Sequence, residues 1–314
     1  MKLKKKINVL IVGSGVLGAY LTKSLPNKNY NIVVATRNLK KNYINYDKLK
    51  INKKVKFTKL NFEKKNNIEK LIEKYKPIHI YYFAGQSSIF KSIKLPKSTI
   101  ASNYTGAKNF LEIIHRKKLK IKFFKANSGY IFFNNGKKIT LNFKIMKPNN
   151  PYVFAQIKAY KLIKNYRKKG LHCYSLIFFN IESILRPKDF FIKKICFSVK
   201  NNKKIDVGNI NNVRDFAWAP EIMKGVSYLH KIKPCDMIFG SGTGMSGREI
   251  IKYIYRLKKL NYKNFIKINF NLFRKKENQF VVSSMSETIR KLKKFKWKPK
   301  TYGKKLLKKM YLDK

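Results

Sequence analysis

The feature that most constrains how this chain can fold is a glycine-spaced turn near its start. Residues 7–12 (INVLIV) form a continuous apolar run, as a buried parallel strand does, and Gly13, Gly15 and Gly18 follow it as G-x-G-x-x-G. Gly13 permits a tight turn, Gly15 lets backbone N–H groups approach a phosphate, and Gly18 allows close helix–strand packing. Because the next segment has helical spacing, its N-terminal N–H groups would face a bound pyrophosphate. The pattern predicts a dinucleotide site, with an ordinary strand–helix turn as the alternative.

Strand-like and helix-like segments alternate over the first 180 residues. Strands are expected at 7–12, 31–36, 55–60, 78–83, 121–126 and 173–180, and helices at 66–75, 103–115 and 152–168. This alternation predicts an α/β fold with a Rossmann-like, doubly wound parallel sheet.

The second half of the chain is less regular. Helices are expected at 190–199, 220–229 and 248–258, the last of them opened by a Ser246-x-x-Glu249 capping box. We therefore expect a dinucleotide-binding Rossmann domain over 1–180, to which 207–230 returns. Residues 181–206 and 231–314 would form a smaller C-terminal substrate lobe.

The end of the second predicted strand indicates which dinucleotide is bound. An NAD-selective site usually has an acidic residue here to hold the ribose 2′-hydroxyl, whereas this chain has Thr36-Arg37-Asn38. A guanidinium can pair with a 2′-phosphate, so Arg37 favours NADP(H), with NAD as the second choice. A solvated surface arginine is the alternative interpretation.

The charge of the chain is strongly positive, with 73 Lys+Arg against 15 Asp+Glu and a net charge of +58. Such a charge is typical of proteins that bind nucleic acid or anionic membranes. However, the excess is almost entirely lysine, it is spread along the whole chain, and it accompanies abundant Asn, Ile, Phe and Tyr, whose codons are also A/T-rich. We therefore expect solvated lysines and no specific nucleic-acid partner, and a polyanion-binding protein remains a remote alternative.

The cysteines, histidines and apolar runs of the sequence predict neither disulfides, nor a metal site, nor a membrane span. Cys173, Cys196 and Cys235 form no CxxC pair, and the four histidines are not at metal-ligand spacing, so we expect reduced thiols and no metal site. No run reaches the roughly 18 apolar residues of a membrane span, and the basic start leads into a strand rather than a signal peptide. The sequence thus predicts a cytoplasmic protein without a membrane span.

A series of short motifs, in shared order from about residue 7 to 300, carries a resemblance to a known family. They are Ala84-Gly-Gln-Ser-Ser88 with Ser92, Pro96, Thr99, Asn103 and Gly106; Pro148-Asn-Asn-Pro-Tyr152; Asn180-Ile-Glu-Ser183 with Arg186, Phe190 and Lys194; Gly208-Asn209 with Arg214-Asp215-Phe216; Gly242, Ser246, Arg248 and Glu249; Arg274 and Glu277; and Trp297-Lys-Pro299. Through them the chain resembles the extended short-chain dehydrogenases/reductases, the NAD-dependent epimerase/dehydratase family. Within that group it is most similar to GDP-mannose 4,6-dehydratase.

The resemblance implies a nucleotide sugar similar to GDP-mannose as substrate, and a homo-oligomer. The implied cofactor-binding residues are Gly13, Gly15, Val16, Leu17, Gly18, Arg37, Asn61, Phe62, Ala84 and Gln86. The implied substrate-binding residues are Ser87, Asn180, Glu182, Lys194, Arg214, Arg274 and Glu277. Cations among the latter suit a diphosphate, which arginine binds through paired hydrogen bonds.

The resemblance also implies a catalytic group of a Ser or Thr, a Tyr, and a Lys four residues after the Tyr. Ser128 and Tyr152 stand at the first two positions, but Gln156 stands in place of the Lys, whose charge would favour the phenolate. Lys158 lies about 240° around a helix from Tyr152 and points elsewhere. Tyr130 stands in place of the Glu that takes the C5 proton in a dehydratase, and a phenol is a poor substitute for that base.

Three hypotheses follow from these matches and departures. The first is an NADP-dependent enzyme that oxidises or reduces a nucleotide sugar at C4, either as a dehydratase or as a 4-keto-sugar reductase or epimerase that needs no C5 base. The second is a catalytically impaired homologue that only binds nucleotide, because residues that act as a unit fail together. The third is the polyanion-binding protein. We rank the first ahead because the nucleotide-sugar positions are kept.

Overall fold

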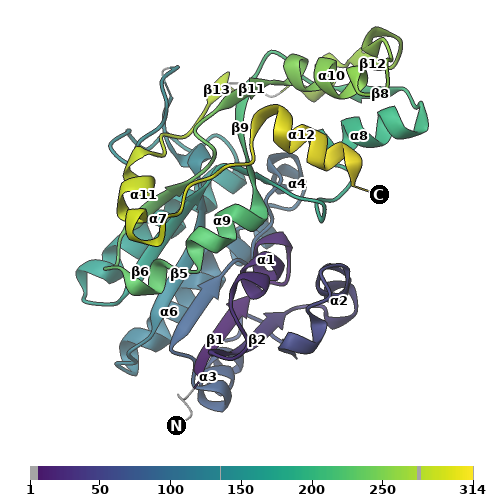
Figure 1. The fold of residues 1–314 in the computed structure, drawn as a ribbon. Coiled ribbons are helices and arrows are strands. Elements are labelled where there is room, and N and C mark those ends of the chain that lie inside the picture. Colours follow the sequence, from purple (N-terminus) through teal and green to yellow (C-terminus); the bar gives the residue numbers. More distant parts are fainter. Residues whose placement is uncertain (1–5, 135, 274–276, 314) are drawn as a thin grey trace. The chain divides into compact units, whose positions relative to one another are not determined.

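The computed structural model describes residues 6–134, 136–273 and 277–313 (Figure 1). The chain divides into two compact units. The first unit comprises Met1–Ile131, Lys144–Ile177 and Met223–Met237. The second unit comprises Phe132–Phe143, Phe178–Ile222 and Ile238–Lys314.

A seven-stranded sheet with the order β10-β6-β5-β4-β1-β2-β3 forms the centre of the first unit. Its strands are β1 (Ile7–Val12), β2 (Tyr30–Thr36), β3 (Val55–Lys59), β4 (His79–Tyr82), β5 (Lys122–Ser128), β6 (Cys173–Phe178) and β10 (Asp236–Phe239). β1 pairs in parallel with β2 and β4, β2 with β3, and β4 with β5. The predicted Rossmann-like, doubly wound parallel sheet is thus confirmed.

Apolar residues on both faces of these strands explain the sheet. The α helices around it are α1 (Val16–Ser24), α2 (Leu39–Lys48), α3 (Lys65–Tyr75), α4 (Ile89–Lys94), α5 (Pro96–Ile100), α6 (Gly106–Arg116), α7 (Pro151–Lys168) and α9 (Ala219–Val226), and the last of these crosses from the second unit into the first. On one face, Leu10 and Phe123 pack in a cluster with Ile68 of α3, Phe110 of α6 and Ile163 of α7. Strand residues of the opposite parity, such as Val9 and Phe124, are equally buried, so both faces are covered.

The helix predicted at 103–115 is part of a longer helical segment with an irregular start. α5 leads into a π-helical turn, η2 (Ala101–Thr105), and α6 continues from Gly106. A π turn inserted into a helix re-aims the side chains on it and is frequent at functional sites. It places Asn103 in the interior of the first unit, where its side chain is 3% exposed.

The second unit is built on short strands and three packed helices. In its four-stranded sheet, β9 (Val213–Trp218) pairs with β7 (Asn180–Glu182), β11 (Gly244–Ser246) and β13 (Phe280–Val281), and β8 (Ile205–Val207) pairs with β12 (Ile266–Ile268) in a second sheet. α8 (Phe191–Asn201), α10 (Gly247–Arg256) and α12 (Gly303–Leu312) share an apolar cluster, and α11 (Ser286–Lys291) is a shorter helix. The predicted capping box of Ser246 and Glu249 is present at the start of α10.

Candidate active site

The glycine loop between β1 and α1 has the geometry of a phosphate cradle. A Cβ atom on Gly13, whose φ is +108°, would lie 2.7 Å from the backbone N of Ala84, and one on Gly18 would lie 2.3 Å from the carbonyl O of Gly13. Packing therefore requires glycine at both positions. A Cβ on Gly15, in contrast, would meet no atom of the described residues within 4 Å. The space above Gly15 is open, as the approach of a phosphate requires.

The N-terminus of α1 opens onto this space. Gly15 is the N-cap residue and has no side chain to accept from the first N–H groups of the helix, whose first turn holds no acidic residue. Val16 and Leu17 form that first turn. Unpaired N–H groups and the positive end of the helix dipole suit an anion, so the residues present fit a dinucleotide pyrophosphate.

Residues at the ends of β2 and just after β3 form a second part of the candidate cofactor site. The exposed guanidinium of Arg37 lies 5.3 Å from the ring centroid of Phe62, a cation–π arrangement. Asn109 of α6 fixes this segment by donating to the carbonyl oxygens of Phe62 and Glu63 over 3.1 Å each. Asn61 is exposed and accepts from the Glu63 N–H, which shapes the turn. Arg37 and Phe62, both predicted to bind the cofactor, thus lie close together.

A chain of hydrogen-bonded amides, from the half-buried Gln86 to the buried Asn103 and Gln156, joins the segment after β4 to η2 and α7. Gln86 donates to the carbonyl of Ser88 over 2.7 Å, and Asn103 donates to the carbonyl of Gln86 over 3.0 Å. Gln156 of α7 in turn donates from Nε2 to Oδ1 of Asn103 over 2.9 Å. Gln156 is 4% exposed, and its Oε1 is buried without a hydrogen-bond partner among the described residues. Asn103 belongs to a family motif, but sequence reasoning had not placed it in the site.

Ser128, Tyr130 and Tyr152 lie in the first unit. Tyr152 is in the first turn of α7, where Asn150 caps the helix by accepting from the Val153 N–H over 2.9 Å. Ser128 ends β5, and its hydroxyl accepts from the N–H of Tyr130 over 3.2 Å. Ser128 and Tyr152 are both buried, and Tyr130 is half-buried. The carboxyl end of a parallel strand and the N-terminus of the helix that follows it are where active sites of such folds lie.

One buried lysine had no place in the sequence-based site. Lys125, in the middle of β5, is 1% exposed, and its ammonium donates to the carbonyl of Ala126. The same ammonium lies 5.5 Å from the ring centroid of Tyr82. Burial alone lowers the pKa of Lys125 to about 7. In a chain so rich in lysine, no sequence signal distinguishes this one from its solvated neighbours.

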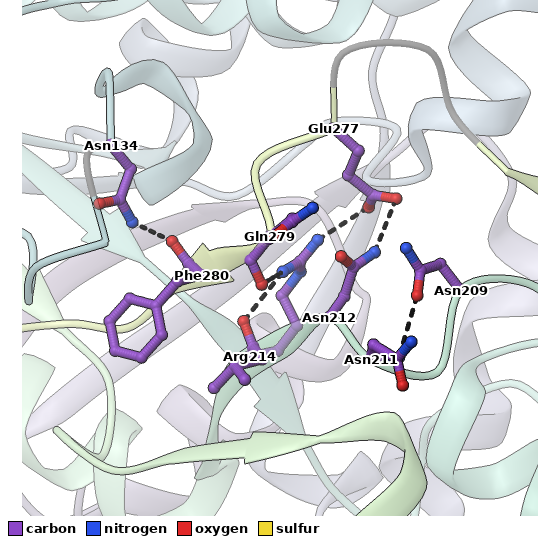
Figure 2. A network of polar contacts seen from close by, with 9 residues as sticks. Asn134, Asn209, Asn211, Asn212, Arg214, Glu277, Gln279 and Phe280 are labelled. Atoms are coloured by element: carbon purple, nitrogen blue, oxygen red, sulfur yellow. Dashed lines mark hydrogen bonds and ion pairs between the residues drawn. The ribbon is translucent and has the colours of Figure 1, made fainter.

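In the second unit, the predicted substrate residues Arg214 and Glu277 form a partly buried ion pair (Figure 2). Arg214 Nη2 donates to Oε1 of Glu277 over 2.8 Å, and Nη1 donates to the carbonyls of Val213 and Gln279. Glu277 Oε2 accepts from Asn212 over 3.0 Å. The guanidinium is therefore held in one orientation on β9. Arg274, also predicted to bind the substrate, falls outside the described residues.

The other predicted substrate residues have separate surroundings. Asn180 donates to the carbonyl of Asp215 over 3.1 Å, and Lys194 donates to the carbonyl of Asp206 over 2.6 Å. Glu182 is 3% exposed and has Arg186 Nε 3.7 Å away, and its burial raises the pKa of its carboxyl above the usual value. Ser87 is exposed in the turn before α4. The bonds of Asn180 and Lys194 hold the backbone of the second unit.

Asp215, the neighbour of Arg214 in its motif, is the main polar anchor of this unit. Its fully buried carboxylate accepts from the N–H and hydroxyl of Ser241, from the N–H of Gly242, and from the N–H and hydroxyl of Ser283. A buried carboxylate is stable when its lone pairs are satisfied in this way. Asp215 thereby fixes the turn after β10 and the segment after β13 around β9.

Two further observations concern metal sites and membranes. Across the described ranges, no three His, Cys, Asp or Glu side chains come together in a group that could hold a metal ion. No helix in the described part of the chain is both long enough and apolar enough to cross a membrane.

Known sequences and structures resemble this chain over nearly its whole length. GDP-mannose 4,6 dehydratase 1 of Arabidopsis thaliana is 27% identical over 328 residues, covering 98% of this chain and 89% of that protein. A UDP-glucuronic acid 4-epimerase from Bacillus cereus, in complex with UDP-glucuronic acid and NAD, has a TM-score of 0.86 at 16% identity, covering 98% of each chain. A dTDP-glucose 4,6-dehydratase from Bacillus anthracis, in complex with NAD, has a TM-score of 0.83 at 18% identity, covering 97% of this chain and 95% of that one.

The structural likeness establishes the fold, and the sequence comparison establishes the family. The family model described as GDP-mannose 4,6 dehydratase matches residues 10–310, a span that includes the glycine loop, Tyr152 and Glu277. The predicted resemblance is confirmed, and the chain belongs to the GDP-mannose 4,6 dehydratase family of the extended short-chain dehydrogenases/reductases.

Proposed function

We propose that the protein binds NADP(H) on its first unit and uses it to oxidise and reduce a nucleotide sugar similar to GDP-mannose at C4. The observation that carries this proposal is the glycine loop, in which Gly13 and Gly18 are sterically required and the space above Gly15 is open. Free N–H groups at the start of α1 would hold the pyrophosphate. Arg37, exposed beside Phe62, would pair with the 2′-phosphate, which favours NADP(H) over NAD.

The chemistry at C4 would fall to Ser128 and Tyr152. The bound nicotinamide supplies the acceptor or donor of the hydride. Tyr152 would remove the proton from the C4 hydroxyl as the hydride leaves, and Ser128 would hydrogen-bond the same oxygen as it becomes a carbonyl. The free amide oxygen of Gln156 can accept from a ribose hydroxyl, but the amide adds no charge to favour the phenolate.

The nucleotide part of the substrate would be held by Arg214 and Glu277. A guanidinium presents a rigid fork that matches phosphate oxygens, and its orientation here is set by Glu277 and two backbone carbonyls. Glu277 can also accept from hydroxyl groups of the nucleotide ribose. This assignment predicts that GDP-mannose binds with Arg214 as its main cation.

The residue at position 130, a tyrosine, favours a reductase or epimerase over a dehydratase. Elimination of water across C5 and C6 needs a base at C5, and Tyr130 stands where the family has the Glu for that step. Exchange of hydride at C4 alone needs no such base. We therefore place 4-keto-sugar reduction or epimerisation ahead of dehydration as the reaction.

The test is a titration of NADPH and NADP⁺ by intrinsic fluorescence, with and without GDP-mannose, at low and high salt. We expect saturable binding in the micromolar range that persists at high salt and tightens with the sugar nucleotide. Analysis of the sugar on the same samples separates epimerised or reduced products from a 6-deoxy-4-keto product. Saturable binding without any product would leave a nucleotide-binding homologue, and binding that disappears with salt would point to non-specific attraction of anions by the lysines.

A further inference from the structure

Lys125 is a buried cation of the first unit that neither the family pattern nor the proposed chemistry uses. Its ammonium is buried, and none of the described acidic residues forms an ion pair with it. Of its three N–H donors, one is satisfied by the carbonyl of Ala126. Burial of a cation without an anionic partner destabilises the folded state, so we expect a buried lysine to be kept only where it has a function.

The side chain of Lys125 points into the same layer as Gln156. Side chains of β5 alternate between faces, so Lys125 shares the face of Phe123, which packs with Ile163 of α7 in one core cluster. On β4, Tyr82 is the register partner of Lys125, and its hydroxyl donates to the carbonyl of Ser102 in η2. The next residue in η2, Asn103, is the one that accepts from Gln156.

Lys125 and Gln156 are also both displaced toward the same edge of the sheet. From Phe123, Lys125 is two residues, or about 6.6 Å, nearer the carboxyl edge of the sheet. α7 links β5 to its neighbour β6 and runs back along the strands, so Gln156 is about 10.5 Å nearer that edge than Ile163. Both residues therefore lie toward the carboxyl edge of the sheet from the core cluster that Phe123 and Ile163 share. The bond to Ala126 shows that the ammonium is already turned toward that edge.

Gln156 and Lys125 have complementary hydrogen-bonding groups that are not paired. Gln156 Oε1 is a buried acceptor without a partner, and the ammonium of Lys125 has two further donors. A buried acceptor without a partner is destabilising, so a small rotation that joins the two is favoured. The ammonium of Lys125 would then contact the amide of Gln156, which occupies the position of the missing family lysine.

We propose that Lys125 supplies from β5 the cation that a lysine at position 156 would have supplied from α7, acting through Gln156 as a positioning residue. Its ammonium donates to Oε1 of Gln156 and sets the charge felt by the nicotinamide end of the cofactor. This role rests on the proposed function, because the nicotinamide is assigned to that place by the position of Gln156 in the family motif.

The charge of such a group depends on pH in the neutral range. Because burial lowers the pKa of Lys125 to about 7, the amine is charged at pH 6 and mostly neutral at pH 8.5. A charged Lys125 disfavours the positively charged nicotinamide of NADP⁺ and leaves the neutral ring of NADPH unaffected. For two unit charges about 10 Å apart, in an effective dielectric of about 20, the difference is about tenfold in relative affinity.

The experiment measures the ratio of the dissociation constants of NADP⁺ and NADPH between pH 6.0 and 8.5, by fluorescence titration and without any sugar substrate. Both nucleotides carry the same phosphates, so phosphate titration cancels in the ratio. We expect the wild-type ratio to be about tenfold higher at pH 6.0 than at pH 8.5, with a midpoint near 7. We expect Lys125→Met to give a constant, low ratio. The double variant Lys125→Met/Gln156→Lys should raise the ratio again, because it returns the cation to α7.

Lys122→Met is the matched control. It removes a lysine from the same strand, but Lys122 has the opposite parity and bonds to the carbonyl of His230. It should keep the wild-type pH dependence. Lys125→Met is expected to fold, because it replaces a buried amine by an apolar side chain of similar length; near-ultraviolet circular dichroism checks this.

The outcomes separate this role from the proposed function. If the wild type binds both nucleotides tightly but the ratio of their dissociation constants does not change with pH, the role of Lys125 is overturned and the proposed function stands. A Lys125→Met protein that keeps the wild-type pH dependence also overturns the role of Lys125. If Lys125→Met does not fold, the wild type and Gln156→Leu decide the question, because loss of the amide should weaken the pH dependence. A wild type that binds neither nucleotide overturns the proposed function and this role with it.

Discussion

Gln156 donates from Nε2 to Oδ1 of Asn103 over 2.9 Å and thereby joins α7 to the π-helical turn η2 in the interior of the first unit. The position that would carry a catalytic cation in the family thus carries a structural hydrogen bond here. Both side chains are almost fully buried, so the bond has no competition from solvent.

The first prediction concerns this bond. Gln156→Leu removes the donor, keeps a similar volume, and leaves Asn103 Oδ1 buried without a partner. We expect the free energy of unfolding to fall by about 1–2 kcal/mol, measured by urea denaturation. Phe154→Leu, at an exposed position two residues earlier on the same helix, should change it by less than about 0.5 kcal/mol. Equal stability of wild type and Gln156→Leu would show that the bond contributes nothing.

The second prediction concerns the open space above Gly15. A Cβ atom at position 15 meets no atom of the described residues within 4 Å, so we expect both Gly15→Ala and Gly15→Asp to keep the wild-type stability. Gly15→Asp places a carboxylate where the pyrophosphate would bind, and we expect at least a tenfold loss of NADPH affinity in a fluorescence titration. Gly15→Ala should lose less. An unchanged affinity in Gly15→Asp would place the cofactor elsewhere.

The sheet and its cofactor loop could be predicted from sequence because the signals for them are local. The apolar run of β1, the glycines at 13, 15 and 18, and the helical spacing of α3 lie within a few residues of the elements they specify. The fold class followed from their alternation. The family motifs assigned Arg214 and Glu277 to the same substrate site but did not predict their ion pair, since no local pattern connects residues 63 positions apart.

Features that depend on distant segments could not be predicted. Lys122 and Lys125 look alike in the sequence, yet Lys125 is 1% exposed, because burial is decided by what packs on each face of β5. Similarly, the segment 132–143 joins the second unit through a bridge in which the Ile139 N–H donates to the carbonyl of Val282. The segment carries no strand pattern of its own, and its partner lies more than 140 residues away.

The third prediction concerns stability in acid. His79 is 4% exposed, and burial, with the positive charges of His230 and Lys122 as lesser causes, lowers its pKa to about 3. The unfolded chain binds a proton below about pH 6.5, whereas the folded chain resists it. Stability from this group is therefore complete above pH 6.5 and is lost as the pH falls toward 3, by about 2 kcal/mol at pH 5.

Urea denaturation between pH 5 and 7 measures this loss. His79→Phe keeps an aromatic ring beside Phe124 and cannot titrate, so its stability should depend less on pH than that of the wild type. His115→Gln removes an exposed imidazole and should leave the pH dependence unchanged. If the His79→Phe curve is as steep as the wild-type curve, the acid sensitivity arises from another group.

The last prediction concerns the choice of cofactor. Arg37 lies at the end of β2 with its guanidinium beside the Phe62 ring, and we assign it to the 2′-phosphate that distinguishes NADPH from NADH. Arg37→Ser removes the cation at an exposed position, so the fold should not change. We expect the affinity for NADPH to fall by about tenfold or more, with little change for NADH.

The ratio of the two affinities is the informative quantity, because loss of one positive charge would weaken every anion slightly. Lys59→Ser, at the end of neighbouring β3, serves as the matched control, since it removes an exposed cation close by in the sheet. It should weaken both cofactors equally and leave their ratio as in the wild type. A parallel loss for NADPH and NADH in Arg37→Ser would mean that Arg37 acts only through the general positive field, and that another residue selects the cofactor.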